Sequence, residues 1–332
     1  MIDEDWNEYN KEKQEMEEKR MTSKTIENAL RYHAFVKWLS DGCEASLAEL
    51  ERICKKPCLQ KSLSVDEIGK IQRGIVAEVK FYSLFREELL LTPTLDAGCA
   101  FDFVGVEKQQ QGERLVRIDV TRDIKCKQNW KRPIGYGQTR WPFRIAHFLD
   151  NKKCVDWYDE KVQIPLYSSA FLEKECAPCV PGMKIFAENA WFSKARREVL
   201  EKIECRHSLD KALDEALDVV ENSGLNKGNK ERLCIEAIFF ATYKYALNIV
   251  PALSYGDLCD FIGEHDGELV RYRVLITADR YYEEERPWLE QLSKTFKYKV
   301  ALFDARTKLF LFYDWNNPKL TEENPFMGLD GE

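Results

Sequence analysis

The chain has 332 residues, of which 44% are hydrophobic and 32% are charged, so it can bury a large core beneath a well-solvated surface. This composition excludes a disordered or fibrous protein. With 50 Lys and Arg residues against 57 Asp and Glu residues the net charge is −7, which excludes a wholly polycationic nucleic-acid coat but not a local basic patch.

The spacing of apolar residues and of helix breakers divides the chain into five regions. A helix begins at Ser64, where Glu67 completes a capping box, and this helix opens the first folded core. The regions are an N-terminal helical region (1–63), a first α/β core (64–167), a mainly helical linking region (168–230), a second α/β core (231–318) and a loose tail (319–332).

Two segments of the chain follow the same pattern. Glu78 lies on a predicted helix 24 positions before Asp102, and Glu236 lies on a predicted helix 24 positions before Asp260. Each Asp opens a run of Asp-Phe-aliphatic-Gly, and the triplet Leu-Val-Arg follows in both segments. The pattern favours an internal repeat in which each copy is an α/β sandwich, with a mixed sheet flanked by helices.

The first copy carries three acidic residues in the order helix, strand, next strand. Gly74 and Glu78 lie on the helix, Asp102 opens one strand, and Asp119 lies near the end of the next strand. This order resembles the core of the PD-(D/E)XK nuclease superfamily. The resemblance implies two restriction-endonuclease-like cores, hydrolysis of phosphodiester bonds in DNA, and Mg²⁺ or Mn²⁺ as the cofactor.

Asp102 and Asp119 are the metal ligands that this pattern predicts. Phosphodiester hydrolysis uses divalent cations to activate water, and Mg²⁺ accepts one or two protein carboxylates and keeps waters for its remaining positions. The two carboxylates would face each other across antiparallel strands, and Glu78 would complete the cluster through a water. Asp123 is the alternative to Asp119, because Asp123 and Lys125 have the spacing Asp-x-Lys.

The sequence departs from the superfamily pattern at Thr121. The pattern places a lysine two positions after the second acid, where it orients or deprotonates the attacking water. A threonine hydroxyl only positions water by hydrogen bonding. Either Lys125 or Lys127 reaches back into the site in place of the missing lysine, or Thr121 marks an inactive site.

A basic segment follows the acidic residues. Between Arg122 and Arg144 it holds seven positive residues and one acid, a net charge of +6, interleaved with aromatic residues. Positive side chains neutralise phosphates and aromatic rings stack on bases, whereas a solvated face above core aromatics is the alternative. The predicted nucleic-acid-binding residues are Arg122, Lys127, Lys131, Arg132, Arg140, Trp141 and Arg144.

A second metal site is suggested by cysteine spacing in the linking region. Cys176, Cys179, Cys205 and His207 follow the order C-x2-C and C-x-H, which is a zinc-ligand pattern. The alternative is a set of incidental thiols. The chain has 11 cysteines, an odd number scattered over its length, which indicates a reduced protein rather than a disulfide framework.

Membrane insertion and secretion are not expected. The sequence holds no uncharged apolar run of about 18 residues, and it starts with acidic residues where a signal peptide has a basic and then an apolar run. We therefore expect a cytoplasmic protein, or a nucleoid or nuclear one if it acts on DNA.

The two copies differ where the first has Asp119. Arg273 or Leu275 takes this position in the second copy, depending on the alignment. The sequence therefore predicts a metal-dependent nuclease acting on DNA, with catalysis in the first core. The alternative is a non-catalytic nucleic-acid-binding or protein-interaction module on degenerate nuclease-like cores. Nucleic acid is the expected partner, with a second copy of the chain or another protein as a further one.

Overall fold

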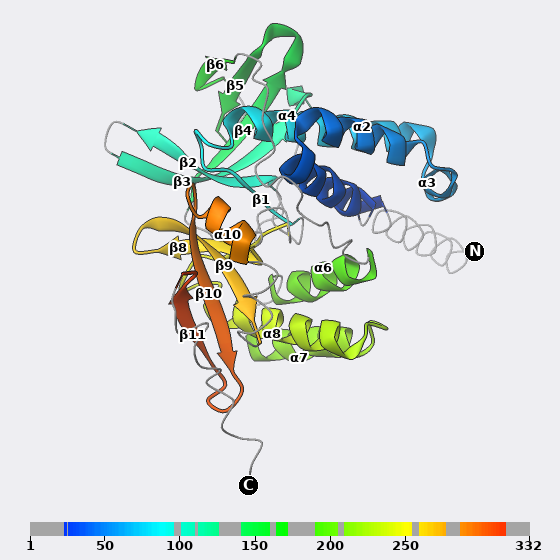
Figure 1. The fold of residues 1–332 in the computed structure, drawn as a ribbon. Helices are drawn as coiled ribbons and strands as arrows, with labels where there is room; N and C mark the ends of the chain where they lie inside the picture. The colour runs from blue at the N-terminus through cyan, green and yellow to red at the C-terminus, as the bar shows by residue number, and fades with distance from the viewer. Residues whose placement is uncertain are drawn as a thin grey trace, which may run out of the picture.

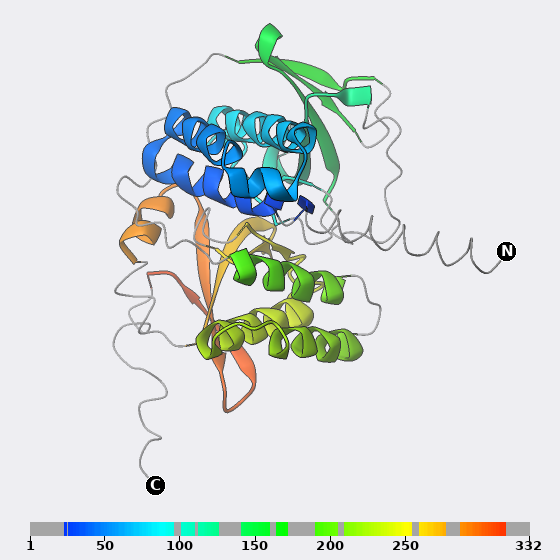
Figure 2. The same ribbon diagram turned by 90° about the vertical axis from the view of Figure 1, so that its right-hand side faces the viewer.

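The structure, a computed structural model, consists of two α/β halves. It describes residues 23–24, 26–95, 101–109, 112–125, 141–159, 164–171, 190–204, 209–253, 259–276 and 286–316. Both sheets are mixed and flanked by helices, and the helical layers of the two halves lie on the same side of the molecule (Figures 1 and 2). In the described residues no helix is long and apolar enough to cross a membrane.

The first half places a layer of helices against a six-stranded sheet. A helix over residues 26–41 precedes α2 (Cys43–Cys54), α3 (Pro57–Ser62) and α4 (Val65–Phe85). The predicted capping box is confirmed: the Ser64 side chain accepts from the Glu67 amide, and the Glu67 carboxylate accepts from the Ser64 amide. The sheet follows the order β1 (Thr92–Pro93), β2 (Phe103–Gln109), β3 (Gly112–Thr121), β4 (Phe143–Leu149), β5 (Cys154–Tyr158) and β6 (Tyr167–Ala170), with a 3-10 turn at Asp150–Lys152.

The second half likewise has helices followed by the strands of a mixed sheet. Its helices are α6 (Ala190–Glu204), α7 (Leu209–Glu221) and α8 (Lys227–Tyr243), and its five-stranded sheet has the order β11-β10-β9-β8-β7. The strands are β7 (Val250–Pro251), β8 (Phe261–His265), β9 (Glu268–Leu275), β10 (Lys297–Asp304) and β11 (Leu309–Asp314), with α10 (Arg286–Leu292) before β10. In both sheets the third strand runs parallel to the fourth, and the other neighbours are antiparallel.

The helices of the predicted linking region belong to the helical layer of the second half. Helices α6 and α7 share one hydrophobic core with α8 and the second sheet, as the helix over 26–41 and α2 do with α4 and the first sheet. The N-terminal residues 1–22 and the predicted tail 319–332 lie outside the described residues.

Strand register identifies the equivalent residues of the two halves. Phe103 pairs with Ile118 in the first sheet, and Phe261 pairs with Tyr272 in the second. Because the following residue of β3 and of β9 is then also equivalent, Asp119 corresponds to Arg273. Of the two alignments left open by the sequence, the one with Arg273 is confirmed.

The two sheets meet through equivalent residues. Thr94 and Ala252 form an isolated antiparallel bridge next to β1 and β7. The Leu95 amide donates to the Pro251 carbonyl at 3.0 Å, and in the reciprocal bond the Leu253 amide donates to the Pro93 carbonyl at 2.9 Å. Each contact therefore has a mirror contact made by the equivalent residues, which is the pattern of an isologous two-fold interface within one chain.

The Asp-Phe-aliphatic-Gly motif ends in glycine in both halves, and the reason is steric. A Cβ on Gly105 would lie 2.9 Å from the Leu89 carbonyl oxygen, and a Cβ on Gly263 would lie 2.7 Å from the Leu247 carbonyl oxygen. The next residue in each strand donates its amide to that same carbonyl, so the backbone must approach closely. Only glycine leaves room for this contact.

We predict that Gly263→Ala lowers the free energy of unfolding by about 1–3 kcal/mol, because the added methyl group would also lie 2.5 Å from Ile249 Cγ2. Urea unfolding followed by circular dichroism measures the change. Gly228→Ala is the matched control: Gly228 lies in α8 with open space around it, so we expect unchanged or slightly higher stability. Equal stability of the Gly263→Ala variant and the wild type would contradict the steric argument.

Candidate functional site

A buried arginine joins the helical layer to the sheet in the first half. Arg31, on the helix over residues 26–41, donates from Nε to Glu78 Oε2 on α4 at 2.6 Å. Its Nη1 and Nη2 donate to the carbonyl oxygens of Thr94 at 3.1 Å and Asp102 at 3.4 Å, and Nη2 lies 3.7 Å from Asp102 Oδ1. The planar guanidinium thus fixes one helix carboxylate and two strand ends at once.

The second half repeats this arrangement with Arg196 on α6. Its Nε donates to Glu236 Oε2 at 2.5 Å, and its Nη1 and Nη2 donate to the carbonyl oxygens of Ala252 at 3.0 Å and Asp260 at 2.7 Å. The partners are the equivalents of those of Arg31, so we call Arg31 and Arg196 the clamp arginines. Because each clamp arginine binds a carboxylate on the neighbouring helix, these contacts explain why Glu78 and Glu236 occupy equivalent helix positions.

In the second half two further arginines enclose Asp260. Arg273 Nη1 lies 2.7 and 2.9 Å from the two Asp260 carboxylate oxygens, and Arg232 Nη2 lies 3.2 Å from Oδ1. The Val274 amide donates to Oδ2 at 2.8 Å. Burial raises the pKa of Asp260, but Arg273, Arg232 and Arg196 outweigh burial and hold this pKa below its usual value.

In the first half the positions of these two arginines hold a glycine and an acid. Gly74 lies four residues before Glu78, as Arg232 lies four residues before Glu236, and a Cβ on Gly74 would meet nothing within 4 Å. Asp119 takes the position of Arg273. At these five equivalent positions the first half therefore has one arginine and three acids, whereas the second has three arginines and two acids.

Asp102 and Asp119 form an acidic pair at this place, the carboxyl pair of the first half. Asp102 precedes the Phe103–Ile118 pair and so lies across from Asp119 on the neighbouring strand. Asp102 Oδ2 accepts from the Val120 amide at 2.7 Å, the same bond that Asp260 makes. The Asp102 side chain is 19% exposed, whereas that of Asp260 is 0% exposed. Asp119 itself is buried, with 5% of its surface exposed. The first centre is thus acidic and partly exposed at Asp102, and the second is closed.

Glu78 is a buried acid beside a second acid. Burial raises the pKa of Glu78, and Arg31 lowers it while the charge of Asp102 raises it further, so that the pKa lies well above the usual value.

The carboxyl pair has the donor chemistry of a magnesium or manganese site. Mg²⁺ takes oxygen ligands, often only one or two carboxylates, and completes its shell with waters. Glu78, in contrast, is engaged by Arg31. Within the described ranges no group of three or more His, Cys, Asp or Glu side chains is arranged to hold a metal ion. Asp102 and Asp119 are the carboxylates of the first centre that could hold a cation.

The residues after β3 are engaged in a turn. Thr121 Oγ1 accepts from the Asp123 amide and donates to the Asp123 carbonyl, both at 3.2 Å. Asp123 Oδ1 accepts from the Lys125 amide at 3.0 Å, so this carboxylate oxygen fixes the chain direction after the strand. Lys125 and Arg122 are exposed.

Two members of the predicted basic segment lie in intramolecular contacts. Arg144 donates from Nε and Nη2 to the Glu107 carboxylate at 3.1 and 3.0 Å. Trp141 is buried, and its Nε1 donates to Glu264 of the second half at 3.1 Å. The remaining predicted contacts, Lys127, Lys131, Arg132 and Arg140, lie outside the described residues, as do the predicted zinc ligands Cys176, Cys179, Cys205 and His207.

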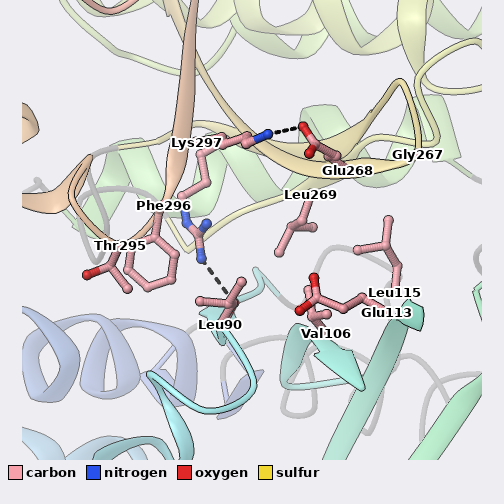
Figure 3. Close-up of a pocket in the computed structure, with 11 residues that line it drawn as sticks. Leu90, Val106, Glu113, Leu115, Gly267, Glu268, Leu269, Thr295, Phe296 and Lys297 are labelled. Atoms are coloured by element: carbon pink, nitrogen blue, oxygen red, sulfur yellow. Dashed lines mark hydrogen bonds and ion pairs between the residues drawn. The ribbon is translucent and has the colours of Figure 1, made fainter. Parts of the chain in front are cut away.

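A small cavity of about 160 Å³ lies at the junction of the halves, away from the carboxyl pair. Figure 3 shows Leu90, Val106 and Leu115 of the first half facing Leu269 and Phe296 of the second. Charged residues at the rim of this cavity have partners within the molecule: Lys297 pairs with Glu268, and Arg271 donates to the Leu90 carbonyl. The cavity walls are thus those of the interface between the halves.

Comparison with known proteins adds no relative: no family model, no curated protein and no solved structure matches this chain. The informative comparison is therefore between the two halves of the chain itself. It separates the positions that both halves share, such as those of the clamp arginines, from the positions at which they differ.

We predict that Asp260→Asn lowers the free energy of unfolding by about 3–5 kcal/mol at pH 7, because it removes the buried carboxylate charge that Arg273, Arg232 and Arg196 stabilise. The pKa of Asp260 is lowered in the folded state, so its stabilisation is present above the usual aspartate range and is lost as the pH falls through the folded-state value. The difference between variant and wild type should therefore narrow in acid.

Urea unfolding at pH 7 and near pH 3 measures this difference. Asp66→Asn is the control, since Asp66 is largely exposed on α4 and should leave stability unchanged at both pH values. A difference of the same size at both pH values would contradict the assigned role of the Asp260 charge.

Proposed function

We propose that the protein is a metal-dependent nuclease that hydrolyses phosphodiester bonds of DNA, with its catalytic centre in the first half. One observation carries the proposal: Gly74 and Asp119 stand where the second half has Arg232 and Arg273. The replacement leaves the carboxyl pair of the first half without the two arginines that neutralise Asp260 in the second. The acids also follow the order that the resemblance to the PD-(D/E)XK superfamily implies.

At this centre a cation would supply one part of the chemistry, and the side chains of the protein would supply the other. A divalent cation supplies charge neutralisation at the phosphate and activation of a water. Asp102 and Asp119 would hold the cation, and the Val120 amide fixes the orientation of Asp102 through Oδ2. Arg31 holds Glu78 and the strand end that carries Asp102, so it sets the position of the carboxyl pair.

The open space at Gly74 supports access to this centre. In the second half the side chain of Arg232 extends from the equivalent position to Asp260 at 3.2 Å. A glycine here leaves this volume for water, a cation or a phosphate oxygen. The exposed Arg122 and Lys125 follow Asp119 on the same strand end and would contribute positive charge toward a nucleic-acid backbone.

A non-catalytic nucleic-acid-binding module is the second candidate, and a specific observation favours it. Glu78 makes the same contact with Arg31 as Glu236 makes with Arg196, so this acid has a structural partner in both halves. Thr121, which replaces the lysine of the superfamily pattern, is engaged by the main chain of Asp123. The two candidates differ in one measurable property, which is cleavage.

We predict that the full chain cleaves DNA in the presence of Mg²⁺ or Mn²⁺, and that Gly74→Arg combined with Asp119→Arg lowers the rate about 100-fold or more. The two arginines would close the first centre as Arg232 and Arg273 close the second, and loss of the cation removes several kcal/mol of transition-state stabilisation. Conversion of labelled DNA with and without EDTA measures cleavage.

Gly228→Arg combined with Asp314→Arg is the control, because it adds the same charge at sites remote from the centre, on α8 and β11. Asp119→Asn tests the ligand without a change of size. Cleavage that persists in the double-arginine variant or in Asp119→Asn would overturn the site. DNA binding without cleavage in the wild type would favour the non-catalytic module.

A further inference from the structure

A row of polar residues crosses the first sheet next to the carboxyl pair. Thr121 on β3 pairs with His147 on β4, His147 pairs with Asp156 on β5, and Asp156 pairs with Ser168 on β6. We call these four residues the polar row. Paired residues on neighbouring strands have Cβ atoms about 4.5–5.5 Å apart, so each member lies beside the next.

The equivalent row of the second half is apolar. Leu275 on β9 pairs with Leu302 on β10, and Leu302 pairs with Leu311 on β11. These residues correspond to Thr121, His147 and Asp156, because β9, β10 and β11 have the register of β3, β4 and β5. The half with the closed arginine centre therefore has three leucines where the half with the open acidic centre has three polar residues.

The polar row and Asp119 lie on the same face of the sheet. Ile118 and Val120 of β3 point into the core beneath the helices, so Asp119 and Thr121 point to the opposite face. His147 follows Ile145, the strand partner of Asp119, by two positions and shares its face. His147 is thus a diagonal neighbour of Asp119, about 7–8 Å away between Cα atoms.

The His147 ring packs near a neighbouring aromatic ring, and one of its nitrogens makes no hydrogen bond in the described part of the chain. Its ring is partly buried and lies with its centre 6.4 Å from the ring centre of Tyr158. Nδ1 is shielded from solvent and has no hydrogen-bond partner within the described part of the chain. Asp156 beside it accepts at Oδ1 from the Ser168 hydroxyl at 2.6 Å, which fixes this carboxylate. In the second half His265 Nδ1 is likewise buried without a hydrogen-bond partner in the described residues, so the assignment of His147 rests on its place in the polar row.

We propose that His147 is a catalytic residue of the first half, which receives the proton of the attacking water, and that Asp156 and Ser168 are the positioning residues of this side of the site. The inference rests on the proposed nuclease function and supplies what Thr121 lacks. Histidine is the commonest general base, and strand register places His147 beside Asp156 and diagonal to Asp119.

The step balances as a simple hydrolysis. The oxygen of the water forms a bond to phosphorus as the bond from phosphorus to the leaving nucleotide oxygen breaks. One proton of the water passes to a ring nitrogen of His147, and the leaving oxygen takes a proton from solvent. The products are a phosphate monoester and an alcohol, with no change of oxidation state.

The test compares kcat and KM of DNA cleavage in the full chain. General-base catalysis contributes about 10²- to 10⁴-fold, so we expect His147→Ala to lower kcat by at least ~100-fold with little change in KM. Added imidazole should restore part of the kcat of this variant. His147→Leu introduces the residue that the second half carries at this place, so it keeps the sheet packed and should show the same loss.

His265→Ala, on β8 of the second half, is the control and should retain wild-type kcat with no response to imidazole. The experiment distinguishes failure of the nuclease proposal from failure of the proposal for His147. A wild type that cleaves no DNA with either metal ion overturns the nuclease function. A wild type that cleaves and is inactivated by Asp119→Asn, together with His147→Leu and His147→Ala variants of full kcat, overturns the role of His147 alone.

Discussion

The clamp arginines are the interaction on which both halves depend. Each lies almost fully buried and binds one helix carboxylate and two main-chain carbonyl groups at the strand ends. A buried charge is costly unless it is paired and fully hydrogen bonded, and the guanidinium meets this condition because its donors lie in one rigid plane. The contact sets the distance between the helical layer and the first two strands, and hence the place of Asp102 and Asp260.

Because both halves share the clamp-arginine contacts, residues at equivalent positions around them can be compared directly. Around the clamp of the second half, Arg232 and Arg273 neutralise Asp260, and leucines fill the neighbouring row of the sheet. Around the clamp of the first half, a glycine and an acid replace these arginines, and polar residues replace the leucines. Both changes lie at neighbouring positions of the sheet, and both make the first centre more acidic or more polar than the second.

The sequence was sufficient for the parts of the site that depend on local pattern. The capping box at Ser64 and the equal intervals from Glu78 to Asp102 and from Glu236 to Asp260 are readable without a structure, because they reflect helix starts and a repeated unit. The α/β arrangement with two mixed sheets flanked by helices follows from the same pattern. For the second-half equivalent of Asp119, the sequence left two alternatives, Arg273 and Leu275.

The rest depends on contacts between distant residues. Arg31 and Arg196 lie in amphipathic helices where an arginine is normally a surface residue, and their partners are 40 or more positions away. The only sequence signal was an arginine inside an apolar helical run. His147 and Asp156 become neighbours of Thr121 through the parallel pairing of β3 with β4, and a parallel register leaves no turn in the sequence from which it could be inferred. Trp141, expected to stack on bases, instead bonds across the junction to Glu264.

The reciprocal bonds around Thr94 and Ala252 give the molecule the contact pattern of a symmetric dimer, yet both partners belong to one polypeptide. In an assembly of identical subunits every substitution appears twice, and the assembled fraction falls on dilution. Covalent connection removes both constraints. Association of the halves no longer varies with protein concentration, and a substitution that favours chemistry in one half can be accompanied by a stabilising substitution at the matching place in the other.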